Sequence, residues 1–264
     1  MKKSKTEDDM IKYIFVIGLL LIFTGAITVS VPLYTLDMHE NITIPIKQIL
    51  SNDGYQNYSD ILSRYESQLI NGVRDEDNGI NEKNHFFNPV TKTGLGGFKS
   101  SAILAQEYFT IAKNYWKEEK ERDAIYYLGR TLHLIQDSTV PHHAVPTLFD
   151  GHLEYEKWLE DSGTLYTNQT NHGNYQYKTV YDYIYNNSII ALSYFQYCDN
   201  LGTTNYLCCA DNLIPLAQEN SAGIVVLFFE GEDIAIYNTV DQGDIGLISI
   251  FIGIILCLFA VWKR

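Results

Sequence analysis

The 264-residue chain is short of positive charge, with 19 Lys and Arg against 32 Asp and Glu and a net charge of −13. Part of that small positive complement lies at the two ends, so the sequence between them is more acidic still. Tight binding of nucleic acids normally depends on Lys and Arg. The composition therefore argues against a stable, high-affinity nucleic-acid partner, although it leaves a metal-dependent nuclease open.

Three other patterns are missing from the sequence. Strand-like alternation is nearly absent, no Gly-rich phosphate loop is visible, and no Ser or Cys has the arrangement of a catalytic nucleophile. Apolar residues recur instead at helical spacing, so the expected fold is all-α. Polar loops are expected over residues 75–97 and 138–151, and long loops in a helical domain tend to carry function. The expected helices cover residues 59–74, 98–118, 121–137, 152–161, 177–197 and 211–230.

Cysteine is also scarce, with four residues in the whole chain. Cys257 lies in an apolar run near the C-terminus, whereas Cys198, Cys208 and Cys209 cluster. No fourth thiol or histidine is close to that cluster in sequence, which argues against a zinc site made of thiols. We expect one disulfide that closes a small loop in an oxidising compartment, and the sequence does not choose its partners.

Charge is absent from two long apolar runs, residues 13–33 and 245–262. Each is near the ~20 residues that a helix needs to cross a bilayer. Lysines precede the first run and Lys-Arg follows the second, which places both ends on the cytoplasmic side. The sequence thus predicts a cell-membrane protein with a cytoplasmic segment 1–12, two membrane helices, and an extracellular domain 34–230 joined by a linker 231–244.

The fate of the first apolar run is left open by the sequence. Retention would give two membrane anchors, whereas cleavage would leave one anchor at the C-terminal end. No good small-x-small cleavage site precedes Tyr34, which favours retention.

Histidine is rare, with seven residues, yet five of them lie between Asp75 and Glu156. His133 and Asp137 are four apart on an expected helix, so their side chains leave the same face one turn apart. His152 and Glu156 repeat this spacing on the next expected helix, and a histidine-bearing loop joins the two pairs. Imidazole and carboxylate are ligands of zinc and similar divalent cations, so the pattern predicts a metal site.

The alternative is a solvated polar face with no ligand. His133, however, lies beside the apolar stripe of Leu132 and Ile135. Burying imidazoles and carboxylates without partners is costly, and a bound cation compensates all of them together. The metal site is therefore the preferred interpretation.

These residues carry a family resemblance. The pattern His133-x3-Asp137-x5-His143, followed by His152-x3-Glu156, resembles the zinc-dependent phospholipases C. That family includes bacterial phosphatidylcholine-cleaving enzymes and the catalytic domain of clostridial alpha-toxin, and it shares an all-α fold with the S1/P1 nucleases. The upstream segment RDEDNGINEKNHFFNPVT is similar to the family's Asp-x-Asp segment that leads to His-Phe-aromatic-Asp-Pro. The resemblance covers roughly residues 37 to 230, so the expected 34–230 domain is phospholipase C-like.

The resemblance implies which residues bind zinc. His39 with a bridging Asp137 would hold a third ion, which in the family also uses the amino group and carbonyl of an N-terminal Trp. This chain offers such a free N-terminus only if the first apolar run is removed, so two ions are expected and the third depends on processing. Asp77 is an alternative to Asp75, and the x5 spacing selects His143 over His142. The first ion would be held by Asp75, His85, His133 and Asp137, and the second by His143, His152 and Glu156.

The resemblance also implies a reaction. Zinc would activate water for attack on a phosphate ester, with Asp75 as the general base. Glu156 as the last ligand resembles the phospholipase branch, where the nucleases typically place Asp, so we expect phospholipase C-type hydrolysis of a phospholipid at the membrane. Two alternatives stay open, an S1/P1-like surface nuclease or nucleotidase and a non-catalytic surface protein stabilised by metal.

Because the spacing selects His143 as the loop ligand, His142→Ala is expected to be nearly silent.

Overall fold

The computed structural model describes residues 36–77, 82–162, 169–199 and 205–231. Within these ranges the named elements are helical, and β-structure is limited to one isolated bridge between Asn88 and Thr93. The all-α prediction is therefore confirmed for the described part of the chain.

The expected membrane helices, 13–33 and 245–262, lie outside the described residues, as do the segment 1–12 and the linker beyond Gly231. Among the helices that are described, none combines the length and the apolar character needed to span a bilayer.

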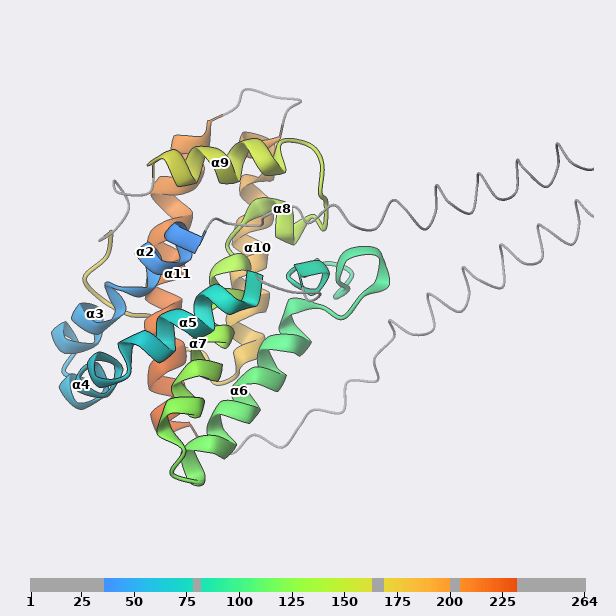
Figure 1. Ribbon diagram of the computed structural model, residues 1–264. Coiled ribbons are helices and arrows are strands. Elements are labelled where there is room, and N and C mark those ends of the chain that lie inside the picture. Colours follow the sequence, from blue (N-terminus) through green and yellow to red (C-terminus); the bar gives the residue numbers. More distant parts are fainter. Residues whose placement is uncertain (1–35, 78–81, 163–168, 200–204, 232–264) are drawn as a thin grey trace, which may run out of the picture. The chain divides into compact units, whose positions relative to one another are not determined.

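Figure 1 shows the order of the helices along the chain. Short 3-10 turns at Glu82–Asn84 (η1) and Leu95–Gly97 (η2) interrupt the long polar loop. The α-helices are α2 (Leu36–Thr43), α3 (Ile46–Asn52), α4 (Gln56–Arg64), α5 (Glu66–Asp77), α6 (Ser101–Lys117), α7 (Glu121–Asp137), α8 (Pro141–Ala144), α9 (His152–Ser162), α10 (Val180–Cys198) and α11 (Tyr206–Glu230).

Most boundaries differ from the sequence-based expectation by a few residues, and α11 begins at Tyr206 instead of 211. The differences that bear on the site are in the first expected helix and after α7. The single helix expected over 59–74 is two helices, because the backbone leaves helical geometry at Tyr65, where φ is −112° and ψ is 27°. The second of them, α5, continues to Asp77 instead of ending at Arg74. The expected loop after α7 also contains the short helix α8, which has Pro141 in its first turn, where the missing N–H of proline costs nothing.

Helix α7 forms the most extensive helix pairs of the fold, with α5 and with α6. Its second half is almost wholly buried, from Leu128 to Asp137. Two glycines let α5 and α7 touch. A Cβ built on Gly129 would lie 2.2 Å from the carbonyl oxygen of Leu69, and one built on Gly72 would lie 2.0 Å from that of Tyr126. The close approach brings the middle of α5 into backbone contact with the middle of α7.

Gly129→Ala is therefore expected to destabilise the protein, because the new methyl group meets backbone that cannot move without separating α5 from α7. The expected loss is about 1–3 kcal/mol or more in the free energy of unfolding. Urea unfolding of the variant beside wild type measures it. A variant as stable as wild type would show that the two helices are not in backbone contact.

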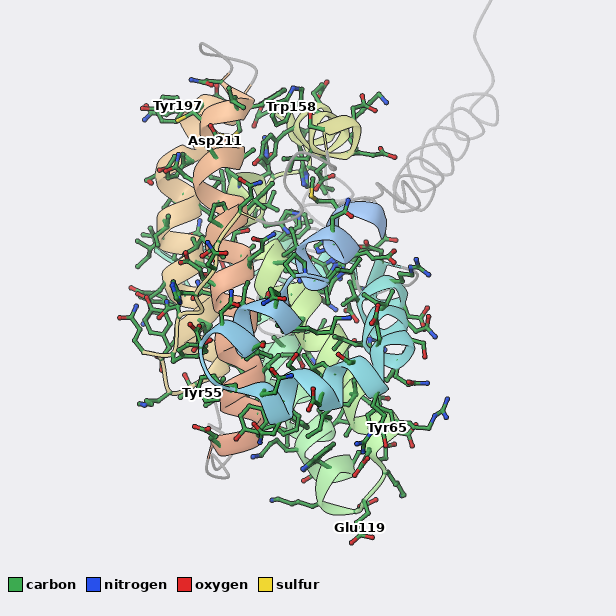
Figure 2. All side chains as sticks on the ribbon, turned by 90° about the vertical axis from the view of Figure 1, so that its left-hand side faces the viewer. Tyr55, Tyr65, Glu119, Trp158, Tyr197 and Asp211 are labelled. Carbon is green, nitrogen blue, oxygen red and sulfur yellow. A yellow bond between two sulfur atoms is a disulfide. The ribbon has the colours of Figure 1, made fainter. Side chains whose placement is uncertain are left out.

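The apolar interior consists of two clusters of buried side chains. The larger is built mainly from α3 to α7, α10 and the second half of α11, and the smaller from α2, α9, the end of α10 and the first half of α11. Helix α9 lies across the ends of α10 and α11 (Figure 1). Trp158 of α9 and Tyr197 of α10 lie at that end, and Glu119, between α6 and α7, lies at the other (Figure 2).

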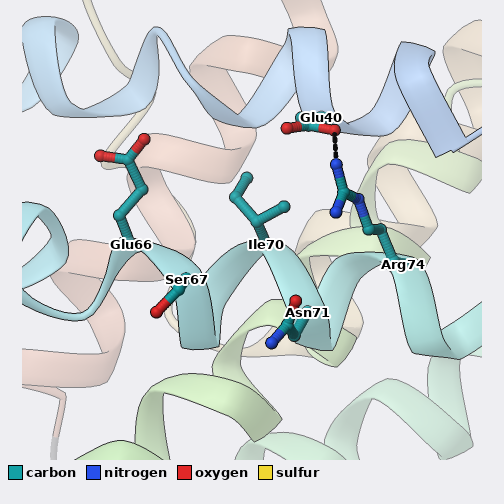
Figure 3. A pocket seen from close by; sticks show the side chains of 6 residues that line it. All are labelled: Glu40, Glu66, Ser67, Ile70, Asn71 and Arg74. Atoms are coloured by element: carbon teal, nitrogen blue, oxygen red, sulfur yellow. Dashed lines mark hydrogen bonds and ion pairs between the residues drawn. The ribbon is translucent and has the colours of Figure 1, made fainter.

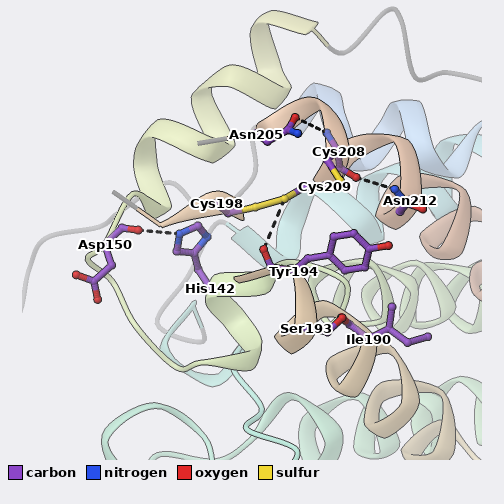
Figure 4. Close-up of a disulfide and its surroundings, with 10 residues drawn as sticks. All are labelled: His142, Asp150, Ile190, Ser193, Tyr194, Cys198, Asn205, Cys208, Cys209 and Asn212. Carbon is purple, nitrogen blue, oxygen red and sulfur yellow. Dashed lines mark hydrogen bonds between the residues drawn. A yellow bond between two sulfur atoms is a disulfide. The ribbon is translucent and has the colours of Figure 1, made fainter. Parts of the chain in front are cut away.

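A disulfide joins Cys198, the last residue of α10, to Cys209 in the first turn of α11 (Figure 4). Cys208 is a free thiol. The expected single disulfide thus has defined partners. It links α10 to α11 at the end of these helices where α9 lies.

Candidate metal centre

The chain brings seven of its predicted metal ligands together in the interior. They come from five separate elements, and six of them are at most 1% exposed, with Glu156 at 3%. His39 is on α2, His85 follows η1, His133 and Asp137 are on the last two turns of α7, His143 is on α8, and His152 and Glu156 are on the first two turns of α9.

Asp137 lies at the centre of the cluster. Its Oδ2 is 2.9 Å from Nδ1 of His85 and 3.2 Å from Nε2 of His133. Its Oδ1 is 3.4 Å from Nε2 of His39 and 3.6 Å from Nδ1 of His143. One carboxylate thus faces four imidazoles, two on each oxygen, which is the geometry expected of a group that bridges cations.

The second part of the cluster is formed by α8 and α9. Oε1 of Glu156 is 2.6 Å from Nε2 of His152 and 3.5 Å from Nε2 of His143. His143, His152 and Glu156 offer three ligand atoms within 4.8 Å of one another, and so do His85, His133 and Asp137. The structure therefore places three of the four predicted ligands of the first ion beside the three of the second, with His143 close to Asp137 and to Glu156.

Hydrogen bonds orient two of the imidazoles. Nδ1 of His133 donates to the carbonyl of Val73 at 2.9 Å, and Nδ1 of His39 donates to Oε1 of Gln136 at 2.8 Å. Both bonds leave Nε2 directed at the cluster. Gln136 is held in turn by its own amide, which donates to Thr43. Partners of this kind fix the ring and the tautomer of a metal-binding histidine. Sequence reasoning missed Gln136, because its partners are about 90 residues away in the chain.

Asp75 is not part of the cluster, and its choice as ligand and general base is corrected. Its side chain is exposed and accepts a hydrogen bond from the hydroxyl of Tyr126 at 3.0 Å. Asp77 occupies the expected place instead, with Oδ1 3.3 Å from Nε2 of His133. The reason is that α5 continues through both residues, and positions two apart on a helix point about 200° apart.

The helical periodicity of α5 indicates that Asp77, and not Asp75, faces the interior. Leu69 and Val73 are buried four residues apart, and the same step reaches Asp77 rather than Asp75. The helix expected from the sequence ends at Arg74, so Asp77 lies beyond its predicted end. Glu76, which was also missed, is buried beside it.

His142 is buried although it belongs to neither group of ligands. Its ring stacks on that of His152 with centroids 4.9 Å apart, and its Nε2 lies 3.2 Å from the carbonyl oxygen of Asp150. Burial lowers the pKa of His142 to about 3, so the ring is neutral at physiological pH. The expectation that His142→Ala is nearly silent therefore holds for metal binding, but we now expect the variant to be less stable than wild type.

His142→Ala and His143→Ala are expected to differ in kind. His142→Ala leaves a cavity and lowers the free energy of unfolding by on the order of 2 kcal/mol while the metal content stays unchanged. His143→Ala removes a ligand, and we expect the loss of about one ion per chain. Metal analysis and urea unfolding of both variants check this, and equal metal loss in both would overturn the choice of His143.

Buried atoms without partners test whether the cluster fits a cation. Both oxygens of Asp77 and of Asp137, and both ring nitrogens of His143, are buried without a protein hydrogen bond of normal geometry. Buried polar groups are seldom left in this way, and each costs about 1–3 kcal/mol. Divalent cations would satisfy these atoms, and a set of imidazoles and carboxylates matches the preference of zinc.

The electrostatics of the cluster lead to the same conclusion. Burial is the largest single influence and would lower the pKa of His85, but the charge and hydrogen bond of Asp137, together with the hydrogen bond to Glu76, raise the pKa to about 9. Burial alone would raise the pKa of Asp137, but the surrounding imidazoles, led by His133, hold it well below its usual range. The buried carboxylates are therefore stable only beside positive charge. Metal ions can supply that charge, and their binding releases the protons of the imidazoles.

A surface pocket lies elsewhere, between α2 and α5 (Figure 3). It is about 380 Å³ in volume, and the Arg74–Glu40 ion pair closes one end of it. None of the predicted ligands lines it. We therefore assign function to the cluster around Asp137 and not to this pocket.

The chain resembles known proteins in sequence. It is 32% identical over 76 residues to a phospholipase C of Paraclostridium bifermentans, which covers 28% of this chain and 19% of that protein. It is 25% identical over 147 residues to a phospholipase C of Bacillus cereus, which covers 50% of this chain and 51% of that protein. The matches span about half or less of these relatives. No protein-family model matches the chain.

Solved structures give a longer match. Alpha-toxin from Clostridium absonum aligns with a TM-score of 0.64 and 18% identity, over 76% of this chain and 67% of that one. Alpha-toxin from an avian strain of Clostridium perfringens aligns over the same shares with a TM-score of 0.63 and 18% identity. The chain has the alpha-toxin fold. The predicted resemblance is thereby confirmed, in sequence to phospholipases C and in fold to the alpha-toxins.

Proposed function

We propose that the chain is a zinc-dependent phosphodiesterase that hydrolyses phospholipids in the manner of a phospholipase C. The observation that carries this proposal is the buried convergence of four imidazoles on the carboxylate of Asp137. Similarity to proteins named phospholipase C and the shared fold of the alpha-toxins support it.

The distances divide the residues between two main ions, and His39 lies with Asp77 and His133 in a third group. Zinc bound there would polarise a phosphoryl group and lower the pKa of bound water towards ~7. His39 and the shared Asp137 would contribute to a third ion. The first ion would be held by His85, His133 and Asp137, joined by Asp77, whose Oδ1 is 3.3 Å from His133 and 3.9 Å from His85. The second would be held by His143, His152 and Glu156.

Asp77 is the general base in this proposal. Its side chain is 12% exposed, whereas Asp137 is fully buried and Glu156 is 3% exposed. Among the three carboxylates of the cluster, Asp77 therefore has the most exposed side chain, although both of its oxygens are buried. A carboxylate next to the attacking water can accept its proton, an effect worth about 10²–10⁴-fold in rate.

Phospholipid is the proposed substrate rather than nucleic acid. Glu156 takes the place of the last ligand, as in the phospholipase branch that the sequence resembles. The net charge of −13 also disfavours a polyanionic substrate such as DNA.

An assay of the full chain, purified in detergent with zinc, tests the proposal. Short-chain phosphatidylcholine and single-stranded DNA are compared with and without chelator, with Asp137→Asn as the inactive control. We expect release of phosphocholine that chelation abolishes and zinc restores. Release of nucleotides in its place would make the protein a nuclease. Zinc retention with neither activity would make it a non-catalytic metalloprotein.

We also propose that residues 34–244 face the outside of the cell between membrane helices at 13–33 and 245–262. The lack of charge in both runs and the flanking Lys and Arg support this topology. Protease added to intact cells should cleave the domain while the protein stays in the membrane fraction. Protection of the domain until the cells are lysed would contradict the proposed topology.

A further inference from the structure

Glu76 is a fully buried carboxylate that lies next to the metal centre without being a ligand in it. It sits on α5 between Asp75, which faces solvent, and Asp77, which faces the cluster. A buried carboxylate is costly unless it is paired and hydrogen-bonded. Its partners therefore show what the position does.

Two side chains from neighbouring helices hold Glu76. Nε of Arg130, on α7, donates to Oε2 at 2.6 Å, and the hydroxyl of Tyr108, on α6, donates to Oε1 at 3.3 Å. The guanidinium of Arg130 also lies over the ring of Tyr108, 4.4 Å from its centroid. Three helices thus fix the orientation of one carboxylate, and Arg130 balances its charge.

The remaining neighbour of Glu76 is a predicted zinc ligand. Oε1 lies 3.4 Å from Nε2 of His85, within reach of a hydrogen bond after a small rotation of the ring. The other nitrogen of the same ring, Nδ1, lies 2.9 Å from Oδ2 of Asp137 and 3.9 Å from Oδ1 of Asp77. His85 therefore has one nitrogen on Glu76 and the other in the metal centre.

We propose that Glu76 is a positioning residue that accepts the Nε2–H of His85 and so presents Nδ1 to the metal. Arg130 occupies Oε2 and neutralises the carboxylate, which keeps Glu76 turned to His85 and prevents it from becoming a ligand itself. A carboxylate behind a metal-binding histidine fixes its tautomer and raises its basicity. The inference rests on the proposed zinc centre and is independent of the proposed substrate.

Zinc affinity tests the inference without an activity assay. Glu76→Gln in the full chain, stripped of metal and titrated against a competing chelator, should bind zinc about 10- to 100-fold more weakly than wild type. The matched control is Asp75→Asn, one residue away and exposed, with wild-type affinity expected. The visible spectrum of the cobalt-substituted protein should change in Glu76→Gln and stay unchanged in the control.

A purely structural ion pair predicts a different result. In that case Glu76→Gln would lower the stability of the metal-free protein, but its zinc affinity and its cobalt spectrum would match wild type, and the inference would be overturned. Tyr108→Phe keeps the ion pair and removes only the hydroxyl contact to Oε1. It should weaken zinc binding by about 2- to 10-fold, and a wild-type affinity would argue against the positioning role.

The tautomer of His85 can also be read in the wild-type protein. Two-bond proton–nitrogen spectra of the zinc-loaded, ¹⁵N-histidine-labelled chain should show the proton of His85 on Nε2. A proton on Nδ1, or a wild-type protein that binds no zinc, would overturn the inference. Zinc binding with the expected tautomer but no phospholipid hydrolysis would support it and would refute only the proposed function.

Discussion

Asp137→Asn is expected to cost the protein at least one metal ion and more than about 100-fold of its hydrolytic activity. Loss of a partner behind a ligand already costs about 10- to 100-fold, and Asp137 is itself placed between two groups of ligands. The amide keeps the shape of the side chain but removes the negative charge that faces four imidazoles. Metal analysis after gel filtration, together with the phosphocholine assay, measures both effects.

The matched control for this change is Asp123→Asn. Asp123 is on the same helix, in its first turn, and is exposed. We expect full metal content and wild-type activity in that variant. If Asp137→Asn kept its metal and its activity, the carboxylate would not bridge anything and the proposed centre would be wrong.

The second large effect separates two acids that are neighbours in sequence. Asp77→Asn is expected to lower activity by about 10²–10⁴-fold and to weaken the first metal site, because Asp77 lies against His133 and is the proposed base. Asp75→Asn is expected to stay within about twofold of wild type, because it loses one exposed hydrogen bond to Tyr126.

Steady-state kinetics and metal analysis of this pair check the orientation of α5. Loss of activity in Asp75→Asn with a normal Asp77→Asn would restore the original choice of Asp75. Equal and large losses in both would show that α5 does not end as described here.

The relative directions of several side chains in the cluster could be predicted from the sequence, because they depend on short spacings along one helix or loop. The two i, i+4 pairs, His133 with Asp137 and His152 with Glu156, do lie on helices with both members facing the same cluster. The x5 spacing selected His143 over its neighbour, and His143 is the one that faces Asp137 and Glu156. Its role as a ligand stays a prediction. Local periodicity sets these directions, so no knowledge of the tertiary fold was needed.

Other parts could not be read because long-range packing decides them. The contact of Arg130 with Glu76 joins residues 54 apart, and that of Gln136 with His39 joins residues 97 apart. The pairing of Cys198 with Cys209 rather than Cys208 depends on the rotation of α11 about its own axis. The error over Asp75 was different, since it came from ending α5 three residues too early.

Crystals of the full chain grown with zinc, measured above and below the zinc absorption edge, test the central claim most directly. We predict anomalous peaks at two places, one among Asp77, His85, His133 and Asp137 and one among His143, His152 and Glu156. Zinc bound only elsewhere, or none bound in this cluster at saturating concentration, would contradict the account.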